Sequence, residues 1–197
     1  MSEGAATDNS RGYDALADAY MRARSADIGA ATVREWCRTL SPGSAVLDLG
    51  CGNGIPISSV MIESGFTVYG VDASPVMIRA FQERFPQAHV ECCAVEDSTL
   101  FERTFDGVIA WGLLFLLPPE VQTSIIAKVA KVLKPGGRFL FTAPQAAVQW
   151  NDVMTDGESV SLGAEAYEAL LGAHGFSLID KAFDEGENYY YLCIKTD

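Results

Sequence analysis

Residues 46–54 read VLDLGCGNG and establish the architecture of the chain. An apolar run that contains Asp48 is followed by Gly50, Gly52 and Gly54, spaced two apart. Closely spaced glycines after an apolar run are typical of a buried strand that turns sharply into a helix. Residues 55–65 (IPISSVMIESG) have a helical pattern that ends at a glycine. We therefore predict a strand, a glycine turn and a helix here.

The alternation of strand and helix patterns continues along the chain. Strand patterns lie at 45–50, 66–72, 88–94, 104–112 and 137–143, and helical patterns lie at 55–65, 74–85, 119–133 and 164–175. Such alternation predicts a parallel sheet with helices on both faces, an α/β doubly wound, Rossmann-like fold. The last two strand patterns, 176–184 and 188–196, are joined by the short polar EGE and predict an antiparallel pair at one end of the sheet.

Two segments flank this regular part. Residues 13–24 and 28–40 have helical patterns, so we expect cap helices within residues 1–40. Residues 144–162 form the one long connection without clear periodicity, and we expect a lid insertion there. We expect both segments to cover the site, to be mobile without ligand and to become ordered when ligands bind.

Composition limits the classes of function. A chain of 197 residues that is 49% hydrophobic and 20% charged is long enough for one core, and we predict one domain over 1–197. The net charge of −12 and the scattered basic residues argue against a nucleic-acid partner. Five cysteines without a C-x-x-C pair suggest neither disulfides nor a metal site. Without a leader pattern or an apolar run of eighteen residues, we expect a cytoplasmic protein with no membrane partner. The oligomeric state stays open.

The glycine turn restricts the ligand. A dinucleotide fingerprint has the spacing G-x-G-x-x-G, whereas this turn has G-x-G-x-G, and Asp48 would repel a pyrophosphate. Asp72 ends the next strand pattern, eighteen residues after Gly54, where an acid can accept both hydroxyls of a ribose. The alternative is that Asp72 only stabilises a turn or caps a helix. The pattern favours a ligand with a ribose, a cationic group and no phosphate, which describes S-adenosylmethionine.

From about residue 10 onward, the sequence resembles the class I S-adenosylmethionine-dependent methyltransferases of the small-molecule type. The motifs are VLDLGCGNG, VYGVDASPVMI, CCAVEDSTLF, FDGVIAWGLLFLL and LKPGGRFLF, in that order. The resemblance implies a seven-stranded sheet with its last strand antiparallel. It also implies a cofactor site made of Asp48, Gly50, Cys51, Gly52, Gly54, Asp72, Ala73, Met77, Val95, Glu96, Asp97 and Ala110. Many relatives have Asp-Ala where this chain has Ala94-Val95, so the contact to the adenine amino group passes to Glu96 or Asp97.

The acceptor side is less defined by the sequence. Phe115 falls where many relatives have a histidine, so the most obvious general base is absent and we expect in-line displacement mainly by proximity, as O- or N-methylation. Any orienting group should come from segments that cap the carboxyl edge of the sheet. The candidates for the acceptor site are Tyr13, Tyr20, Trp111, Phe115, Gln145, Trp150, Asn151 and Asp152, with Glu187 and Asn188 as further possibilities. Their aromatic rings indicate a flat or apolar acceptor, or else only pack the lid.

Other hypotheses stay open beside the enzyme. A non-catalytic protein that senses S-adenosylmethionine or S-adenosylhomocysteine is one, because the cofactor motifs are clearer than the acceptor side. A dehydrogenase of the same layout is the weakest, because Asp48 opposes a pyrophosphate. Cys51 is interpreted as a small turn residue, and His89 and His174 as structural.

Overall fold

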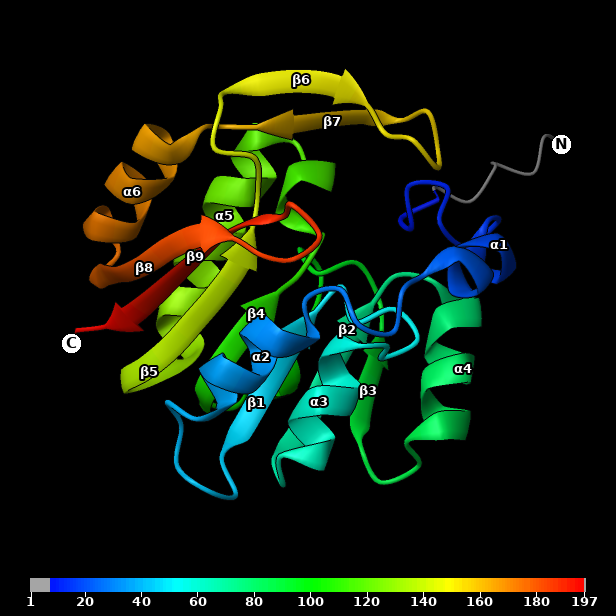
Figure 1. The fold of residues 1–197 in the computed structure, drawn as a ribbon, viewed down its shortest axis with the longest axis horizontal. Helices are drawn as coiled ribbons and strands as arrows, with labels where there is room; N and C mark the ends of the chain where they lie inside the picture. Colours follow the sequence, from blue (N-terminus) through cyan, green and yellow to red (C-terminus); the bar gives the residue numbers. More distant parts are fainter. Residues whose placement is uncertain (1–7, 197) are drawn as a thin grey trace, which may run out of the picture.

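The computed structural model describes residues 8–196, and its centre is a seven-stranded sheet (Figure 1). The strands are β1 (Ala45–Leu49), β2 (Thr67–Asp72), β3 (His89–Cys92), β4 (Phe105–Ala110), β5 (Leu133–Thr142), β8 (Phe176–Phe183) and β9 (Tyr189–Lys195). Their order is β3-β2-β1-β4-β5-β9-β8. Strands β1 to β5 are parallel, whereas β9 is antiparallel to β5 and to β8. The predicted mostly parallel sheet with its last strand antiparallel is confirmed.

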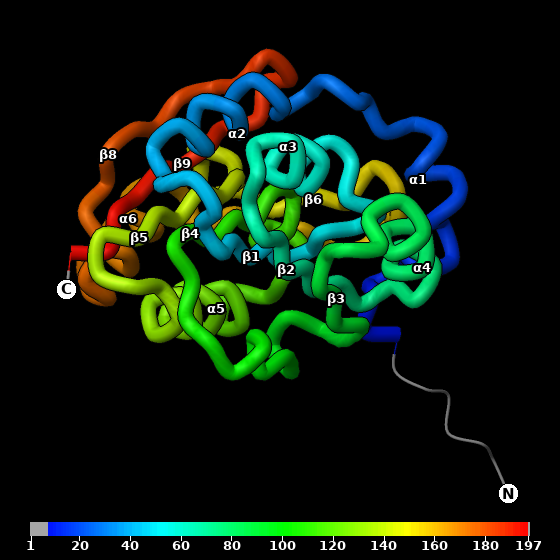
Figure 2. The backbone as a smooth tube through the Cα atoms, turned by 90° about the horizontal axis from the view of Figure 1, so that it is seen from below, coloured from blue at the N-terminus to red at the C-terminus, as the bar shows by residue number. Residues whose placement is uncertain are grey.

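Helices cover both faces of this sheet. They are α1 (Ala17–Ala23), α2 (Ala30–Cys37), α3 (Ile57–Glu63), α4 (Pro75–Arg84), α5 (Pro119–Val132) and α6 (Ala164–Ala173), with short 3-10 helices η1 (Leu100–Glu102) and η2 (Leu114–Leu116). Seen along the sheet, α2, α3 and α4 lie on one face and α5 and α6 on the other (Figure 2). Helix α4 lies within the predicted range 74–85, and Ser74 is its N-cap, accepting a hydrogen bond from the Met77 backbone N–H at 3.1 Å.

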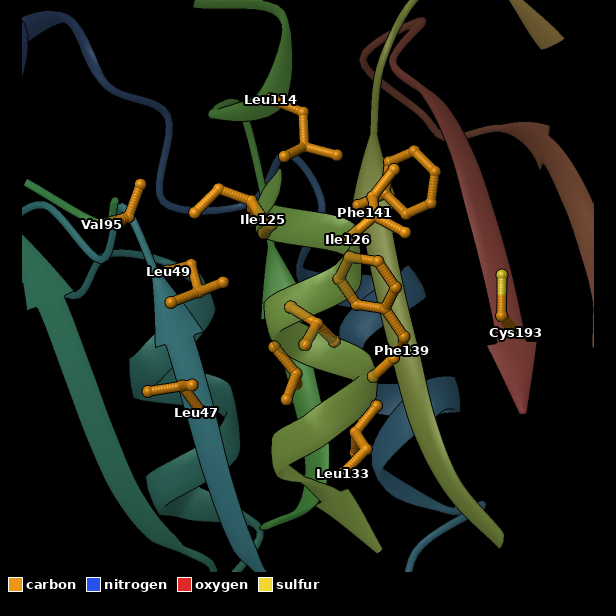
Figure 3. Close-up of a cluster of buried hydrophobic side chains, with 14 of the residues drawn as sticks. Leu47, Leu49, Val95, Leu114, Ile125, Ile126, Leu133, Phe139, Phe141 and Cys193 are labelled. Atoms are coloured by element: carbon orange, nitrogen blue, oxygen red, sulfur yellow. The ribbon is translucent and has the colours of Figure 1, made fainter. Parts of the chain in front are cut away.

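The core is divided by the sheet into two layers. Strand β1 is buried along its whole length because successive side chains point to opposite, covered faces. Val46 packs in the layer under α2 and α3, whereas Leu47 and Leu49 pack in the layer under α5. Figure 3 shows this second layer, in which Leu47 and Leu49 lie on the same side of the sheet as Ile125 of α5. Full burial of each such side chain contributes about 1.5–3 kcal/mol.

The N-terminal helices are shorter than the expected ranges 13–24 and 28–40. Residues 9–16, directly before α1, form turns, in which the Tyr13 N–H donates to the Ser10 carbonyl at 3.1 Å. Helix α2 begins only after Gly29, whose φ of +86° lies in the left-handed region.

The long connection at 144–162 contains a hairpin, β6 (Val148–Asn151) and β7 (Glu158–Ser161). The two strands pair with each other as a separate antiparallel sheet and lie across the carboxyl edge of the parallel strands (Figure 1). The sequence pattern did not indicate these strands because the fully buried positions of β7 are serines, Ser159 and Ser161. An alternation of buried serines with less buried residues carries no hydrophobic period.

Candidate active site

The glycine turn connects β1 to α3 and folds back onto the end of β2. Gly50 and Gly52 have φ of +70° and +52°, conformations that L side chains rarely adopt. The backbone N–H groups of Gly50 and Cys51 both donate to the Val71 carbonyl, at 2.8 and 3.1 Å. The turn therefore lies against the carboxyl end of β2, the edge at which open α/β sheets bind ligands.

Asp72 ends β2, and its carboxylate holds the glycine turn in place. Its Oδ2 accepts a hydrogen bond from the Gly52 N–H at 2.8 Å, and its Oδ1 accepts one from the Ser74 N–H at 2.8 Å. Burial raises the pKa of the Asp72 carboxyl, and the two backbone N–H groups oppose that shift. Each carboxylate oxygen has a further lone pair, so Asp72 can still accept hydrogen bonds from the cleft that it lines.

Asp48 lies inside β1 and has only 1% of its surface exposed. Its Oδ2 accepts a hydrogen bond from the Ser58 hydroxyl at 2.6 Å. Burial raises the pKa of Asp48 to about 7; the Ser58 hydrogen bond opposes the shift, Asp72 adds to it and Arg24 opposes it. Asp48 therefore changes charge near neutral pH, and a nearby cation favours its ionised form.

Arg24 is a residue of this site that the sequence did not single out. It follows α1 directly and lines a small cavity together with Asp48, Asn53 and Trp111. Its Nε is buried and has no hydrogen-bond partner among residues 8–196. A buried donor of this kind is normally paired, so Arg24 has a charged donor available for an anionic group in the cavity. No local pattern marked Arg24, because it comes near Asp48 only in the tertiary fold.

One cleft at the carboxyl edge brings together most of the cofactor residues implied by the resemblance. Those that line it are Gly50, Gly52, Asp72, Ala73, Met77, Val95 and Glu96. Asp48 and Cys51 line the small cavity beside it.

The other three residues of that set, Gly54, Asp97 and Ala110, line neither cavity. Gly54 packs on α4, where a Cβ would come within 2.7 Å of the Phe85 ring. Ala110 is buried in the core and Asp97 is exposed. Burial raises the pKa of the Cys51 thiol, and this thiol packs on Gly70, as expected for a small turn residue.

The segment 9–24, which we call the N-terminal strap, contributes Tyr13 and Tyr20 to the wall of the cleft. The two rings meet edge to face with centroids 5.6 Å apart. Asp14 anchors the strap to the start of α4, because its Oδ1 accepts hydrogen bonds from the Ser74 hydroxyl at 2.6 Å and the Val76 N–H at 3.1 Å. The sequence did not single out Asp14.

A second cavity, of about 350 Å³, lies between the β6–β7 hairpin and the segment that follows η2. We call it the hairpin cavity. Arg11, Tyr13, Leu116 and Leu117 line both the cleft and the hairpin cavity, so the two are adjacent. Asp152 lines the hairpin cavity with 8% of its surface exposed, and its Oδ2 accepts a hydrogen bond from the Tyr13 hydroxyl at 3.2 Å.

The remaining aromatic candidates divide into two groups. Tyr20 and Trp111 line the cleft. Phe115 and Trp150 pack against each other, with ring centroids 5.5 Å apart, and line neither the cleft nor the hairpin cavity. Phe115 and Trp150 therefore connect η2 to the hairpin.

Four polar candidates lie away from both cavities. Gln145 and Asn151 are exposed, and Asn151 donates to the Asp156 carboxylate at 3.0 Å. Glu187 and Asn188 belong to the turn between β8 and β9, where Asn188 donates to Asp184. None of the four lines the cleft or the hairpin cavity.

The two histidines are also placed away from the cleft. His89 stacks on Tyr69, with ring centroids 4.6 Å apart, at the amino end of β3 and opposite the glycine turn. His174 caps the C-terminus of α6, where its carbonyl accepts a hydrogen bond from Lys195.

The fold is Rossmann-like with a cleft at the carboxyl edge of the sheet, and comparison with known proteins identifies a methyltransferase domain in it. Residues 46–137 match a family model described as a methyltransferase domain. The chain is 38% identical over 111 residues to an uncharacterized methyltransferase of Synechocystis, a match that covers 56% of this chain and 52% of that one. It is 32% identical over 167 residues to a ubiquinone biosynthesis O-methyltransferase of Thiobacillus denitrificans, covering 81% and 63% of the two chains.

Among solved structures, the 1,6-didemethyltoxoflavin-N1-methyltransferase of Burkholderia thailandensis, bound to 1,6-didemethyltoxoflavin and S-adenosylhomocysteine, has a TM-score of 0.72. It is 21% identical, and the match covers 100% of this chain and 94% of that chain. Residues 46–137 thus match a methyltransferase domain, and the chain has the fold of the class I S-adenosylmethionine-dependent methyltransferases, in agreement with the sequence motifs. The chain spans between half and two thirds of the length of each of the two curated relatives named above.

In residues 8–196, none of the helices combines the length and the apolarity that crossing a bilayer requires. The same part of the chain holds no group of three His, Cys, Asp or Glu side chains placed to bind a metal ion.

Proposed function

We propose that this protein methylates a small-molecule acceptor, at oxygen or nitrogen, with S-adenosylmethionine as the donor. The pair of acids on the two strands beside the glycine turn, the buried Asp48 and the half-buried Asp72, supports this most directly. Two carboxyl groups at this position disfavour a pyrophosphate, whereas they suit a ligand with a ribose and a positive charge. The family of the chain and the small-molecule methyltransferases among its relatives support the same proposal.

The residues present fit the parts of S-adenosylmethionine. Asp72 would accept the ribose hydroxyls, and Asp48 would face the positively charged methionine part. The unpaired buried Nε of Arg24 would bind the methionine carboxylate, because both groups are charged and the small cavity already contains Arg24. The apolar side chains of Met77 and Val95 would pack on adenine.

The chemistry needs positioning more than proton transfer. The bound donor supplies a methyl carbon on a positively charged sulfur, so the lone pair of the acceptor forms the new bond while the carbon–sulfur bond breaks and leaves its electron pair on sulfur. Holding the acceptor in line can supply roughly 7–11 kcal/mol of the barrier. Burial and then the charge of Asp152 raise the pKa of Tyr13, so its phenol stays protonated and donates a hydrogen bond rather than acting as a base.

The protein must also exclude water from the reacting atoms. The N-terminal strap, with Tyr13 and Tyr20, covers the cleft from one side. The β6–β7 hairpin lies over the carboxyl edge of the parallel strands (Figure 1). Excluding water strengthens every oriented polar contact inside the site. We propose a cytoplasmic enzyme that needs no metal; its five cysteines are free thiols, as is usual in a reducing compartment.

Titration and turnover together test the proposal. Calorimetry should show binding of S-adenosylmethionine and S-adenosylhomocysteine and no binding of NAD; binding of NAD alone would instead support a dehydrogenase. A screen of small amines, phenols, thiols and carboxylates for release of S-adenosylhomocysteine should then identify an acceptor. Binding of S-adenosylmethionine without turnover on any acceptor class would favour a sensor, the second function that the cleft can support.

A further inference from the structure

The hairpin cavity contains a built polar site that the cofactor does not use. We infer that this cavity binds the methyl acceptor and that the acceptor is an amine, an inference that rests on the proposed function. The cavity adjoins the cleft at Tyr13, which lines both, so an acceptor held there would lie beside the cofactor cleft.

Ser159 is the first observation. This serine lines the hairpin cavity and has 0% of its surface exposed, yet its Oγ has no hydrogen-bond partner in the described part of the chain. Ser159 pairs across the hairpin with Trp150, so the two side chains share a face. Trp150 packs on Phe115 of η2, which places that face toward the interior. A buried hydroxyl without a partner costs stability, and a polar ligand group in the cavity would satisfy it.

The hydrogen bonds of Asp152 are the second observation. Its Oδ1 accepts from the backbone N–H groups of Met154 and Thr155 and from the Thr155 hydroxyl, at 2.9 to 3.1 Å. These bonds hold the turn of the hairpin and fix the carboxylate. The Tyr13 hydroxyl donates to both oxygens, at 3.3 Å to Oδ1 and 3.2 Å to Oδ2. Within residues 8–196 this is the one hydrogen bond that Oδ2 accepts, so this oxygen keeps a lone pair for a ligand donor.

Charge selects the class of acceptor. The cavity contains two carboxylates, Asp152 and Glu158, and one basic side chain, Arg11, which already pairs with Glu96 at 3.6 Å. The chain as a whole carries a net charge of −12. Both facts disfavour an anionic acceptor and favour a cationic one. The apolar part of the wall would hold the carbon frame of the ligand; it consists of Leu116, Leu117, Pro118, Pro119 and Val160.

An amine also matches the charge movement of the reaction. An amine that binds as an ammonium ion first releases a proton to water, because only the neutral nitrogen has a lone pair. That nitrogen then forms the bond to the methyl carbon while the carbon–sulfur bond breaks, so nitrogen becomes positively charged and sulfur becomes neutral. A carboxylate beside the nitrogen stabilises the charge where it develops. Asp152 and Glu158 lie in the cavity in which that nitrogen would be held.

Three probes of matched shape test the inference on protein saturated with S-adenosylhomocysteine: phenethylamine, 2-phenylethanol and phenylacetate. Nuclear magnetic resonance should show saturable perturbation of residues 152–160 by phenethylamine. Phenylacetate should bind at least tenfold more weakly. Equal or tighter binding of phenylacetate or 2-phenylethanol would overturn the amine assignment, and perturbation confined to other parts of the chain would overturn the location.

Variants separate recognition from folding. Ser159→Ala removes only an unpartnered hydroxyl, so thermal stability should stay the same or rise, while phenethylamine affinity falls severalfold. Asp152→Asn should lower that affinity at least tenfold. The control is Asp156→Asn, on the same hairpin turn, because Asp156 is exposed, does not line the cavity and carries the same charge. Unchanged affinity in both Ser159→Ala and Asp152→Asn would overturn the inference.

S-adenosylhomocysteine binding is measured first, because it distinguishes failure of the proposed function from failure of the acceptor assignment. If it does not bind, the proposed function and this inference fall together. If it binds and phenethylamine leaves residues 152–160 unperturbed, only the acceptor assignment fails.

Discussion

The Tyr13 hydroxyl lies 3.2 Å from the Asp152 Oδ2, although the two residues are 139 positions apart in the chain. This hydrogen bond joins the N-terminal strap to the β6–β7 hairpin, the two segments that cover the cleft from opposite ends of the sequence (Figure 1). Because this hydrogen bond breaks when either segment moves away from the other, we expect the strap and the hairpin to open together.

We predict that residues 10–22 and 145–160 gain protection from hydrogen exchange when S-adenosylhomocysteine and acceptor are bound. Tyr13→Phe removes a bond worth about 1 kcal/mol, so exchange in both segments should quicken roughly fivefold. The matched control is Tyr190→Phe, which removes the Tyr190 hydrogen bond to Asp180 elsewhere on the surface. Equal protection with and without ligands would mean that the two segments are static scaffold.

Asp72→Ala tests the ribose assignment. Loss of two charge-assisted hydrogen bonds worth about 2–4 kcal/mol together should weaken S-adenosylmethionine binding tens to hundreds of fold, as measured by calorimetry. Glu83→Ala removes an exposed carboxylate from α4 and should leave affinity unchanged. A folded Asp72→Ala protein, checked by circular dichroism, that binds as tightly as the wild type would refute the assignment.

Asp48 predicts a pH dependence of stability. Its pKa is raised from 3.8 to about 7, so between these values the folded protein binds a proton that the unfolded chain does not. The free energy of unfolding should therefore fall as pH rises from about 4 to 7, by at most about 4 kcal/mol. The raised pKa of Asp72 acts in the same direction, whereas the lowered pKa values of Asp8 and Asp106 act only below their ordinary value of 3.8.

Thermal unfolding without ligand, at several pH values between 5 and 8, measures this dependence. Asp48→Asn keeps an acceptor for Ser58 and removes the titration, so the variant should lose most of the slope and gain stability at pH 8. A slope that persists unchanged in Asp48→Asn would assign the effect to another group.

Arg24→Gln tests the carboxylate assignment. S-adenosylmethionine affinity should fall roughly ten- to a hundredfold, because hydrogen bonds to charged groups contribute about 1.5–3 kcal/mol. Affinity for 5′-methylthioadenosine, which lacks the amino-acid part, should not change. Arg22→Gln, on the exposed side of α1, is the control. Equal loss for both ligands would show that Arg24 acts through the fold rather than through the carboxylate.

The sequence by itself determined the sheet, the glycine turn and the position of Asp72. These features are local: a strand, a turn that requires positive φ at Gly50 and Gly52, and a helix follow one another within a short stretch, so residue type and spacing suffice to specify them. The carboxyl ends of parallel strands then meet at one edge, which brings Asp48 and Asp72 together without any further information.

The tertiary structure alone decided how the site is covered and what lies beside it. Strand β7 buries serines instead of apolar residues and β6 is largely exposed, so no hydrophobic period predicted these strands. Arg24 reaches the cavity of Asp48, and Tyr13 reaches Asp152, through packing of segments that are distant in the chain. Such contacts depend on where the strap and the hairpin dock against the sheet, and a single sequence records the residues of each segment but not their docking.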